Sequence, residues 1–323
     1  MEPKTLQDAI VYFSSPDNCR EYLVARRWPN GVICPRCGGS KVTFLAKYNR
    51  WQCGSRHANR QFTSKTGTIF EDSPLSLDKW LTAMWQVVNC KNGISSYEVH
   101  RAIGITQKSA WFMDHRIRHA LGMSPVDKLT GEIEADETFI GGKARNMHAG
   151  KRALRITGTG GKDKTAVMGI LERGKDGKPS QVRTTVIPNR KKKAIQAEVR
   201  KHVEAGSALY SDALQSYSGL TEFEHGVVDH AVQYVDGQIH TNGLENFWSL
   251  LKRGINGTYV SVEPFHLFRY LDEQAWRYNH RKDGTGEPLN DGERFDIAVR
   301  QIVGKRLTWD HLTGKELATA VIN

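Results

Sequence analysis

The chain has 323 residues, of which 39% are hydrophobic and 25% charged, with a formal net charge of +11. These ordinary values allow about two or three domains, at least one with a sizeable core. No hydrophobic run approaches the roughly 18–20 residues of a membrane helix, and residues 1–15 lack the order of a signal peptide. We therefore expect a cytoplasmic protein whose five cysteines do not form a disulfide framework.

The positive charge is concentrated in two segments. Residues 143–164 hold seven Lys or Arg and one acidic residue, Asp163, which leaves a local net charge of +6. A second run, Arg190-Lys191-Lys192-Lys193, lies at a predicted helix start. Either run alone is compatible with a solvated surface, but both flank candidate acidic strands, which favours a nucleic-acid partner.

The first 130 residues predict several short elements. Residues 1–30 contain one amphipathic helical pattern, and a Cys34-x2-Cys37 knuckle after it is followed by β-rich sequence. This knuckle is half of a tetrahedral zinc site, and Cys53 can supply a third thiolate. Apolar residues at helical spacing then predict helices over 77–88, 95–103 and 106–121, before a linker at 122–130.

From residue 133 onward the pattern changes to strands separated by glycine-rich turns. Strands are predicted over 133–140, 164–172, 182–187, 208–211 and 226–229. Helices are predicted over 190–204, from Asn242 onward and over 264–280. The order β-β-β-α-β-(α)-β-α predicts an α/β domain with a mixed sheet.

Three acids carry the chemical signal of this second half. Asp136 lies inside a predicted strand, where Asp is disfavoured. Asp212 follows a strand-like segment, and Glu245 lies near the start of the helix that begins at Asn242. Lys252, seven residues after Glu245, emerges two turns later on nearly the same face of that helix.

Each acid also has an ordinary structural explanation. Asp136 fits an exposed edge strand that resists aggregation, and Asp212 fits a turn or helix cap. With Asn242 as N-cap, Glu245 occupies the third helical position of a capping box. Together, however, the three acids can converge at one edge of a sheet. Converging carboxylates repel one another unless divalent cations neutralise them, so Mg²⁺ or Mn²⁺ suited to phosphoryl transfer is expected there.

The acids and their surroundings resemble the catalytic set of DDE transposases, which have an RNase H-like fold. The segments Glu-Ala-Asp-Glu-Thr-Phe-Ile-Gly-Gly, Tyr-Ser-Asp and His-Thr-Asn-Gly-Leu-Glu-Asn-Phe-Trp resemble ISXO-two-like insertion-sequence transposases, relatives of the Merlin elements. The resemblance covers residues 15–280 and implies a metal site of Asp136, Asp212 and Glu245, with Lys252 beside it. Members also carry an Asn where Asn242 stands, so Glu245, Asn242 or both supply the third ligand; a carboxylate better offsets metal charge, which favours Glu245.

Members of the same family begin with a zinc ribbon, and this chain departs from the usual pattern. The second knuckle usually has a Cys where Arg56 stands. His57 is the expected substitute, which gives a Zn²⁺ site of Cys34, Cys37, Cys53 and His57. A distorted or metal-free ribbon is the alternative.

Residues 94–120 fit the helix-turn-helix that follows the ribbon in this family. Gly104 can adopt the positive φ of the turn, and Thr106 can cap the next helix. The polar side chains of that helix lie away from its apolar stripe, as on a groove-reading helix: Gln107, Lys108, His115, Arg116, Arg118 and His119. A three-helix packing unit without DNA contacts is the alternative.

The resemblance implies a DNA transposase of the bacterial cytosol, at least dimeric when it pairs two element ends. It would bind double-stranded DNA at terminal inverted repeats, cut at the element ends and join the 3′-OH ends to target DNA. Beyond the helix-turn-helix, phosphate contacts are expected from Arg145, Lys151, Arg152, Arg190, Lys191, Lys192, Lys252 and Arg253. An RNase H-like nuclease or resolvase and a non-catalytic zinc-ribbon regulator are the alternatives.

The expected organisation has four parts. A helix and zinc ribbon at 1–75 precede a helix-turn-helix segment at 76–126. An RNase H-like catalytic domain with a mixed five-stranded sheet follows at 127–282, and a helical tail at 283–323 ends the chain.

Overall fold

The computed structural model describes residues 2–122, 127–141, 149–150, 164–175, 177–228 and 240–315. The chain forms two compact units, which are described separately. Unit 1 comprises Met1–Gly122 with Asn290–Asn323, and unit 2 comprises Met123–Leu289. In the described part of the chain, no helix is long and apolar enough to cross a membrane.

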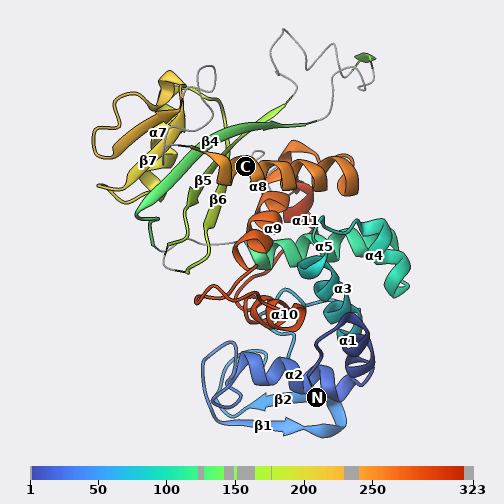
Figure 1. The fold of residues 1–323 in the computed structure, drawn as a ribbon. Helices are drawn as coiled ribbons and strands as arrows, with labels where there is room; N and C mark the ends of the chain where they lie inside the picture. The colour runs from blue at the N-terminus through green and yellow to red at the C-terminus, as the bar shows by residue number, and fades with distance from the viewer. Residues whose placement is uncertain are drawn as a thin grey trace, which may run out of the picture. The chain divides into compact units, whose positions relative to one another are not determined.

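Unit 1 combines a small antiparallel sheet with helices (Figure 1). Its helices are α1 (Leu6–Phe13), α2 (Pro16–Arg27), α3 (Leu77–Asn89), α4 (Ser96–Ile103), α5 (Gln107–Leu121), α10 (Asp291–Arg300) and α11 (Trp309–Thr313). Its strands, in sheet order, are β1 (Val42–Leu45), β2 (Arg50–Cys53) and β3 (Gln61–Phe62). Residues 1–30 hold two helices rather than one, because Ser15 caps a new helix that has Pro16 at its first position.

Helix α10, from near the end of the chain, completes a core of unit 1. Phe295 is fully buried against Phe13, Tyr22 and Trp85, with ring centroids 5.7, 5.7 and 5.0 Å away. Residues separated by more than 200 positions in the sequence therefore share one set of aromatic contacts.

The centre of unit 2 is a mixed five-stranded sheet in the order β6-β5-β4-β7-β8. Its strands are β4 (Glu132–Ile140), β5 (Thr165–Glu172), β6 (Gln181–Ile187), β7 (Ala208–Asp212) and β8 (Glu224–Val228). Strands β4, β5 and β6 pair antiparallel, whereas β7 lies parallel to β4 and to β8. The helices described here are α7 (Lys192–His202), α8 (Asn242–Arg253) and α9 (Leu267–Asn279). The predicted mixed five-stranded sheet is confirmed.

Both faces of this sheet are covered by hydrophobic contacts. Helix α7 packs with Ile133 and Ala135 of β4 on one face, and α8 and α9 pack on the other (Figure 1). Because side chains alternate along a strand, Glu134 and Asp136 lie on the α8 face. Two acids of β4 therefore meet the helix that carries Glu245.

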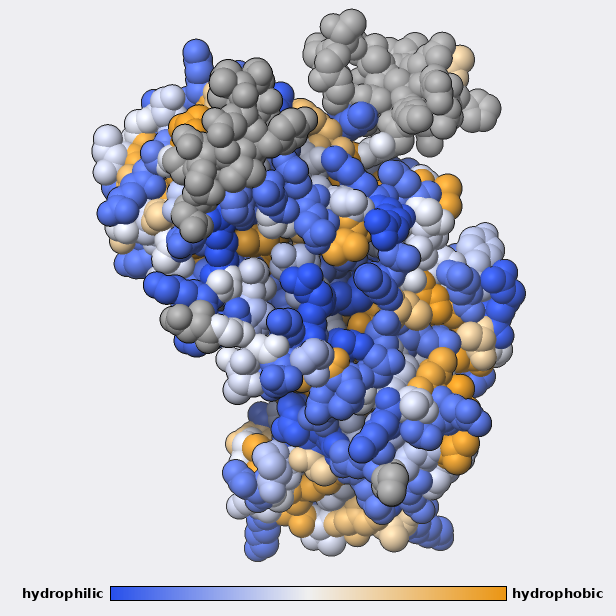
Figure 2. Space-filling model, viewed as in Figure 1, coloured by the Kyte–Doolittle hydropathy of each residue, from blue (hydrophilic) through white to orange (hydrophobic). Residues whose placement is uncertain are grey.

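One edge of the sheet, strand β6, is partly covered by a side chain of helix α9. Asn279 of α9 hydrogen-bonds both backbone groups of Val182 on the edge strand β6, at 2.8 and 2.9 Å. This pairing covers part of an edge that would otherwise present unpaired backbone groups. Hydrophilic residues dominate the face of the molecule drawn in Figure 2, with hydrophobic residues in scattered groups.

Candidate functional site

The four predicted zinc ligands lie together in unit 1. One ligand atom from each of Cys34, Cys37, Cys53 and His57 lies within 4.8 Å of the others. Cys34 Sγ is 3.5 Å from His57 Nε2, and Cys37 Sγ is 3.6 Å from Cys53 Sγ. A tetrahedral Zn²⁺ with normal bond lengths requires S···N of about 3.6 Å and S···S of about 3.8 Å. The spacing therefore fits zinc.

His57 is oriented for this role by its neighbour. Its Nδ1 lies 2.7 Å from the Ala58 carbonyl oxygen. A ring nitrogen that donates to a carbonyl leaves the other nitrogen unprotonated, here the Nε2 that faces the thiols. Trp51 and Phe62 stack beside the knuckles with centroids 5.9 Å apart, and with Trp28 they form the ribbon's small hydrophobic core.

Asp136 and Asp212 are brought side by side by the sheet. The parallel register of β4 and β7 pairs Ala135 with Ser211, and the next residue on each strand is one of these acids. Neighbouring strands are about 4.8 Å apart. Asp212 Oδ1 also accepts a hydrogen bond from the Leu214 amide at 3.1 Å, which orients its carboxylate at the strand end.

Glu245 lies near enough to these two acids to affect the pKa of Asp136. Burial raises the pKa of Asp136, and the negative charges of Asp212 and Glu245 raise it further, against the hydrogen bond from Trp248. Burial, with Asp212 and Asp136 nearby, also raises the pKa of Glu137 to about 7, although Tyr217 donates a hydrogen bond to it. Among the described residues, only the zinc ligands form a tight cluster of three or more metal-binding side chains, so the acids converge less closely.

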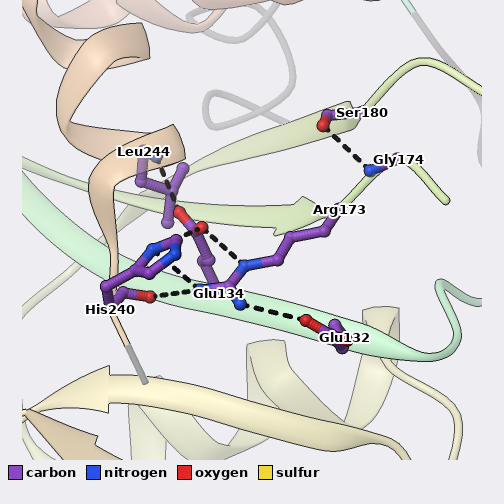
Figure 3. Close-up of polar contacts among 7 residues, drawn as sticks. All are labelled: Glu132, Glu134, Arg173, Gly174, Ser180, His240 and Leu244. Atoms are coloured by element: carbon purple, nitrogen blue, oxygen red, sulfur yellow. Dashed lines mark hydrogen bonds and ion pairs between the residues drawn. The ribbon is translucent and has the colours of Figure 1, made fainter. Parts of the chain in front are cut away.

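The start of α8 differs from the capping box considered above. The N-cap residue is Thr241, without a side-chain capping bond, and Asn242 is the first helical residue. Glu245 thus occupies the fourth position, so the capping-box alternative is wrong. The carboxylate of Glu134 takes the capping role instead, because it accepts a hydrogen bond from the Leu244 amide at 2.9 Å (Figure 3).

Arg173, directly after β5, joins Glu134 to the segment before α8. Its Nε donates to Glu134 Oε1 at 2.8 Å, and its Nη1 donates to Glu132 Oε2 at 3.0 Å. Its Nη2 donates to Nδ1 and to the carbonyl oxygen of His240, at 2.8 and 2.7 Å. Figure 3 shows the guanidinium between strand β4 and His240.

A second contact holds α8 to β4 one helical turn later. Trp248 Nε1 donates to Asp136 Oδ2 at 2.9 Å. The indole lies over Gly169, the cross-strand partner of Asp136, where an added Cβ would be 2.6 Å from the Trp248 ring. Gly169 thus leaves the space that allows the indole to reach the acid.

The basic residues predicted at the start of α7 and the end of α8 are exposed. Arg190, Lys191 and Lys192 lie at the N-terminus of α7, which has no acidic residue in its first turn. Lys252 and Arg253 form the last turn of α8. Positive charge at a helix N-terminus opposes the helix dipole, so the α7 cluster is better explained by an anionic partner than by helix stability.

The segment predicted to form a helix-turn-helix, residues 94–120, has the expected helices α4 and α5 but not all of the predicted exposed surface. Gly104 has φ of 62°, and Thr106 caps α5. Lys108 is exposed, with Nζ 4.6 Å from the Trp309 ring centroid, and Gln107 donates to Ser96 Oγ at 2.9 Å.

Arg116 does not point to solvent as predicted. It is only 4% exposed, and its Nη2 donates to the Glu71 carbonyl at 2.5 Å. His115 and Arg118 are buried as well. These three side chains are therefore packed inside the protein and are not displayed on a free face of α5.

The basic segment before β5 is not covered by these observations. Arg145, Lys151 and Arg152, predicted to contact DNA, lie outside the described residues.

Sequence reasoning missed the residues that hold the acids in place. In the sequence, Trp248 is one of the aromatic residues of the helix that begins at Asn242, and nothing in it assigns a role to Arg173 or Glu134. The one available signal was the alternation of Glu132, Glu134 and Asp136, which places three acids on one face of a strand. Their partners come from distant positions, which spacing alone cannot identify.

Comparison with known proteins decides the family. Residues 128–279 match the ISXO2-like transposase domain, and residues 14–57 match the transposase zinc-ribbon domain. An uncharacterized transposase-like protein of Haemophilus influenzae is 30% identical over 102 residues, which are 31% of this chain and 82% of that protein. The chain belongs to the ISXO2-like transposase family.

A second relative extends the likeness along most of this transposase-family chain. An uncharacterized protein in transposable element ISH50 of Halobacterium salinarum is 28% identical over 293 residues. The match covers 85% of this chain and 95% of that protein. The zinc-ribbon match ends at His57, the fourth residue of the Cys₃His cluster.

Proposed function

We propose that this protein is the DNA transposase of an insertion sequence, which cuts DNA at the element ends and joins the freed 3′-hydroxyls to target DNA. The observation that carries the proposal is the strand register that sets Asp136 beside Asp212, with Glu245 near enough to raise the pKa of Asp136, within the segment that matches the transposase domain. An RNase H-like fold belongs to the same proposal. It is supported by the strand order, which is 3-2-1-4-5 when β4 is counted as the first strand.

The acidic edge of the sheet fits Mg²⁺ or Mn²⁺. All three donors are carboxylates, and hard divalent cations prefer oxygen ligands. Burial, and to a smaller extent repulsion from Asp212 and Glu245, raises the pKa of Asp136, and a bound cation would offset both effects. When bound, such ions activate the attacking oxygen and stabilise the leaving oxygen of an in-line displacement.

The residues of the site divide the remaining tasks. Asp136 and Asp212 hold the metal from neighbouring strands, and Glu245 completes the ligand set from α8. Asn242, exposed in the first turn of that helix, is the alternative or additional third ligand. Lys252 contacts a phosphate oxygen and offsets negative charge that develops there.

The reaction has two steps: the first hydrolyses one phosphodiester bond, and the second exchanges one phosphodiester bond for another. In cleavage, water attacks the phosphorus at the element end, and the 3′-oxygen leaves and takes up a proton. In joining, that 3′-hydroxyl loses its proton, attacks a phosphodiester of the target and displaces a target 3′-oxygen. Joining conserves the number of phosphodiester bonds, so no nucleoside triphosphate is required.

DNA recognition is assigned to both units. The zinc ribbon and the α4–α5 segment, with Gln107 and Lys108, bind the terminal repeats. Arg190, Lys191, Lys192 and Arg253 contact backbone phosphates, and the sequence assigns Arg145, Lys151 and Arg152 to the same role. Pairing of two ends requires at least two copies of the chain.

A strand-transfer assay tests the proposal directly. Duplexes that carry the inverted repeats flanking the gene are incubated with purified protein, Mg²⁺ and a plasmid target. We expect cleaved ends and products joined to the plasmid. Cleavage without joining would instead support a nuclease or resolvase, and end binding without cleavage would support a regulator.

The assigned catalytic site is tested in the same assay with Asp136→Asn. The variant should bind the ends as tightly as the wild type in a mobility-shift assay but yield no cleaved or joined DNA. The matched control is Glu224→Gln, an exposed acid on β8, which should retain activity. Full activity of Asp136→Asn would refute the assignment.

A further inference from the structure

Helix α8 is attached to strand β4 by a buried carboxylate that belongs to neither the acid set nor the helix. Glu134 is 1% exposed and lies two residues before Asp136 on the same face of β4. It accepts a hydrogen bond from the Leu244 amide, one residue before Glu245. One strand therefore supplies the first acid and also fixes the helix that carries the third.

The contact replaces an ordinary helix cap. The first four amides of a helix lack partners within the helix, and a Ser, Thr, Asp or Asn at the N-cap usually accepts one of these hydrogen bonds. Here the side chain of Thr241 makes no capping bond. A carboxylate at the helix N-terminus also interacts favourably with the helix dipole.

Arg173 gives this carboxylate a fixed orientation and ties it to the preceding segment. The partly buried guanidinium contacts Glu134, Glu132 and His240, with distances of 2.7–3.0 Å. Its central carbon, Cζ, lies 4.5 Å from the ring centroid of Tyr210 on β7, the strand that ends at Asp212. The same side chain thus touches residues of β4, β7 and the approach to α8.

The surroundings of Gly243 show how closely helix α8 packs against Glu134. A Cβ at this position would lie 2.8 Å from Glu134 Oε2 and 3.2 Å from both Oε1 and Cδ. Any side chain at residue 243 would therefore displace either the carboxylate or the helix. A glycine early in a helix lowers its stability relative to alanine, so close approach is the physical reason for this glycine.

We propose that Glu134, Arg173 and His240 are positioning residues that set the rotation and height of α8 on the sheet, and so place Glu245 and Asn242 beside Asp136 and Asp212. The anchor at Leu244 and the Trp248 contact with Asp136 lie one turn apart and together allow a single docking of the helix. Glu245 follows Leu244 by about 100° around the helix axis, so a small rotation at the anchor moves its carboxylate directly. The effect of this positioning on catalysis rests on the proposed transposase function.

The experiment compares two glycine substitutions in the full-length protein. Gly243→Ala adds a methyl group against Glu134, whereas Gly257→Ala, in the π-helical segment Gly254–Tyr259 that follows α8, meets nothing within 4 Å. Amide hydrogen exchange at Leu244 should be faster by tenfold or more in Gly243→Ala and unchanged in Gly257→Ala. The single-turnover cleavage rate of Gly243→Ala should fall by about 10–100-fold, the usual effect of losing an outer partner of a metal site, while end binding is retained.

A compensating variant separates positioning from general destabilisation. Glu134→Asp shortens the carboxylate by one methylene group, so alone it should weaken the contact with Leu244. In Gly243→Ala/Glu134→Asp the shorter side chain leaves room for the methyl group. The double variant should recover part of the lost protection of the Leu244 amide against exchange and part of the lost cleavage rate. The effects of the two substitutions would then not be additive.

The outcomes distinguish this proposal from the proposed function. If the wild type neither cleaves nor joins element ends, the transposase proposal fails, and exchange at Leu244 still tests the anchor. If Leu244 exchanges equally in Gly243→Ala and the wild type, the anchor is refuted. Additive losses in the double variant would also refute it, whether or not the protein is active.

Discussion

The two candidate metal sites are built in different ways. In the ribbon of unit 1, four ligand atoms already lie within 4.8 Å of one another, on strands of only two to four residues and their flanking loops. In unit 2, the acids lie on a five-stranded sheet with a hydrophobic core on each face, and protein contacts hold the strands and α8 together. We therefore expect the ribbon to need bound zinc to fold, whereas we expect the packing of unit 2 to position the strands that carry the acids without a metal.

Zinc removal should give the largest effect and should affect the ribbon alone. Structural zinc contributes about 10–16 kcal/mol of apparent binding free energy in small finger peptides, which a core as small as the ribbon's cannot replace. Cys53→Ser protein should lose its near-stoichiometric zinc and become susceptible to proteolysis between residues 28 and 62. Metal analysis and mapped limited proteolysis measure both effects.

Cys90→Ser is the matched control, since Cys90 lies outside the ribbon and has no role in the zinc site. It should retain zinc and resist proteolysis. If Cys53→Ser left the ribbon equally resistant, the ribbon would not depend on zinc, and the contrast between the two sites would fail.

Asp212→Asn tests the other side of the contrast. The strand-transfer rate should fall by more than about 100-fold, because even outer partners of metal ligands are worth 10–100-fold. The free energy of unfolding should not fall, since Asn retains the acceptor for the Leu214 amide and the substitution removes a charge that repels Asp136. Denaturant unfolding and the strand-transfer assay, run on the same preparation, give the two values.

A loss of stability in Asp212→Asn that matched the loss of activity would mean that the acid is part of the scaffold. The division between scaffold and ligands in unit 2 would then be wrong.

Gly169→Ala should disturb the scaffold itself. The added methyl group would lie 2.6 Å from the Trp248 ring and 2.9 Å from Leu244, so α8 must move away from the sheet. Overpacking of this kind costs about 1–3 kcal/mol of unfolding free energy. The cleavage rate should fall as well, because Trp248 then loses its hydrogen bond to Asp136. Tryptophan fluorescence, denaturant unfolding and the cleavage assay measure these effects. If all three gave the same values as for Gly257→Ala, tight docking of α8 on the sheet would be excluded.

The smallest effect is expected for Asp296 of α10, which forms ion pairs with Arg26 and Arg300 in unit 1 and takes no part in the zinc site. Hydrogen bonds from Arg300 and Arg26 lower the pKa of Asp296 despite its burial. A lowered pKa in the folded state contributes stability above the unfolded value of 3.8 and loses it as the pH falls through the folded value. Asp296→Asn should therefore cost about 1 kcal/mol or less at pH 7, since the site is partly exposed.

Urea unfolding at pH 7 and near pH 3 measures this effect. The difference between Asp296→Asn and the wild type should shrink at the lower pH. A difference that stayed constant would show that charge on Asp296 is not what links α10 to α2.

Much of the fold and the Cys₃His cluster of the ribbon were predictable from local signals in the sequence, and the metal-binding role of Asp136, Asp212 and Glu245 stays a prediction. Strands and helices of unit 2 follow from alternation and helical spacing, and the Cys34-x2-Cys37 knuckle follows from ligand spacing alone. The predicted exposure of Arg116 was wrong because a helical pattern identifies its apolar stripe but not how many neighbours surround the helix. The capping box at Asn242 was wrong because the acceptor that caps α8, Glu134, lies 110 residues away from Leu244 in the sequence.

The sequence by itself determined the candidate ligands, the family pattern and the order of elements, since each depends on residue type and short-range spacing. Only the tertiary structure decided which side chains hold those ligands in place. Phe295 completes a core formed mainly by residues near the N-terminus, and Arg173 joins β4 to His240. Such contacts depend on the register of β4 with its neighbours and on the close approach that Gly169 and Gly243 permit, and neither is encoded in local spacing.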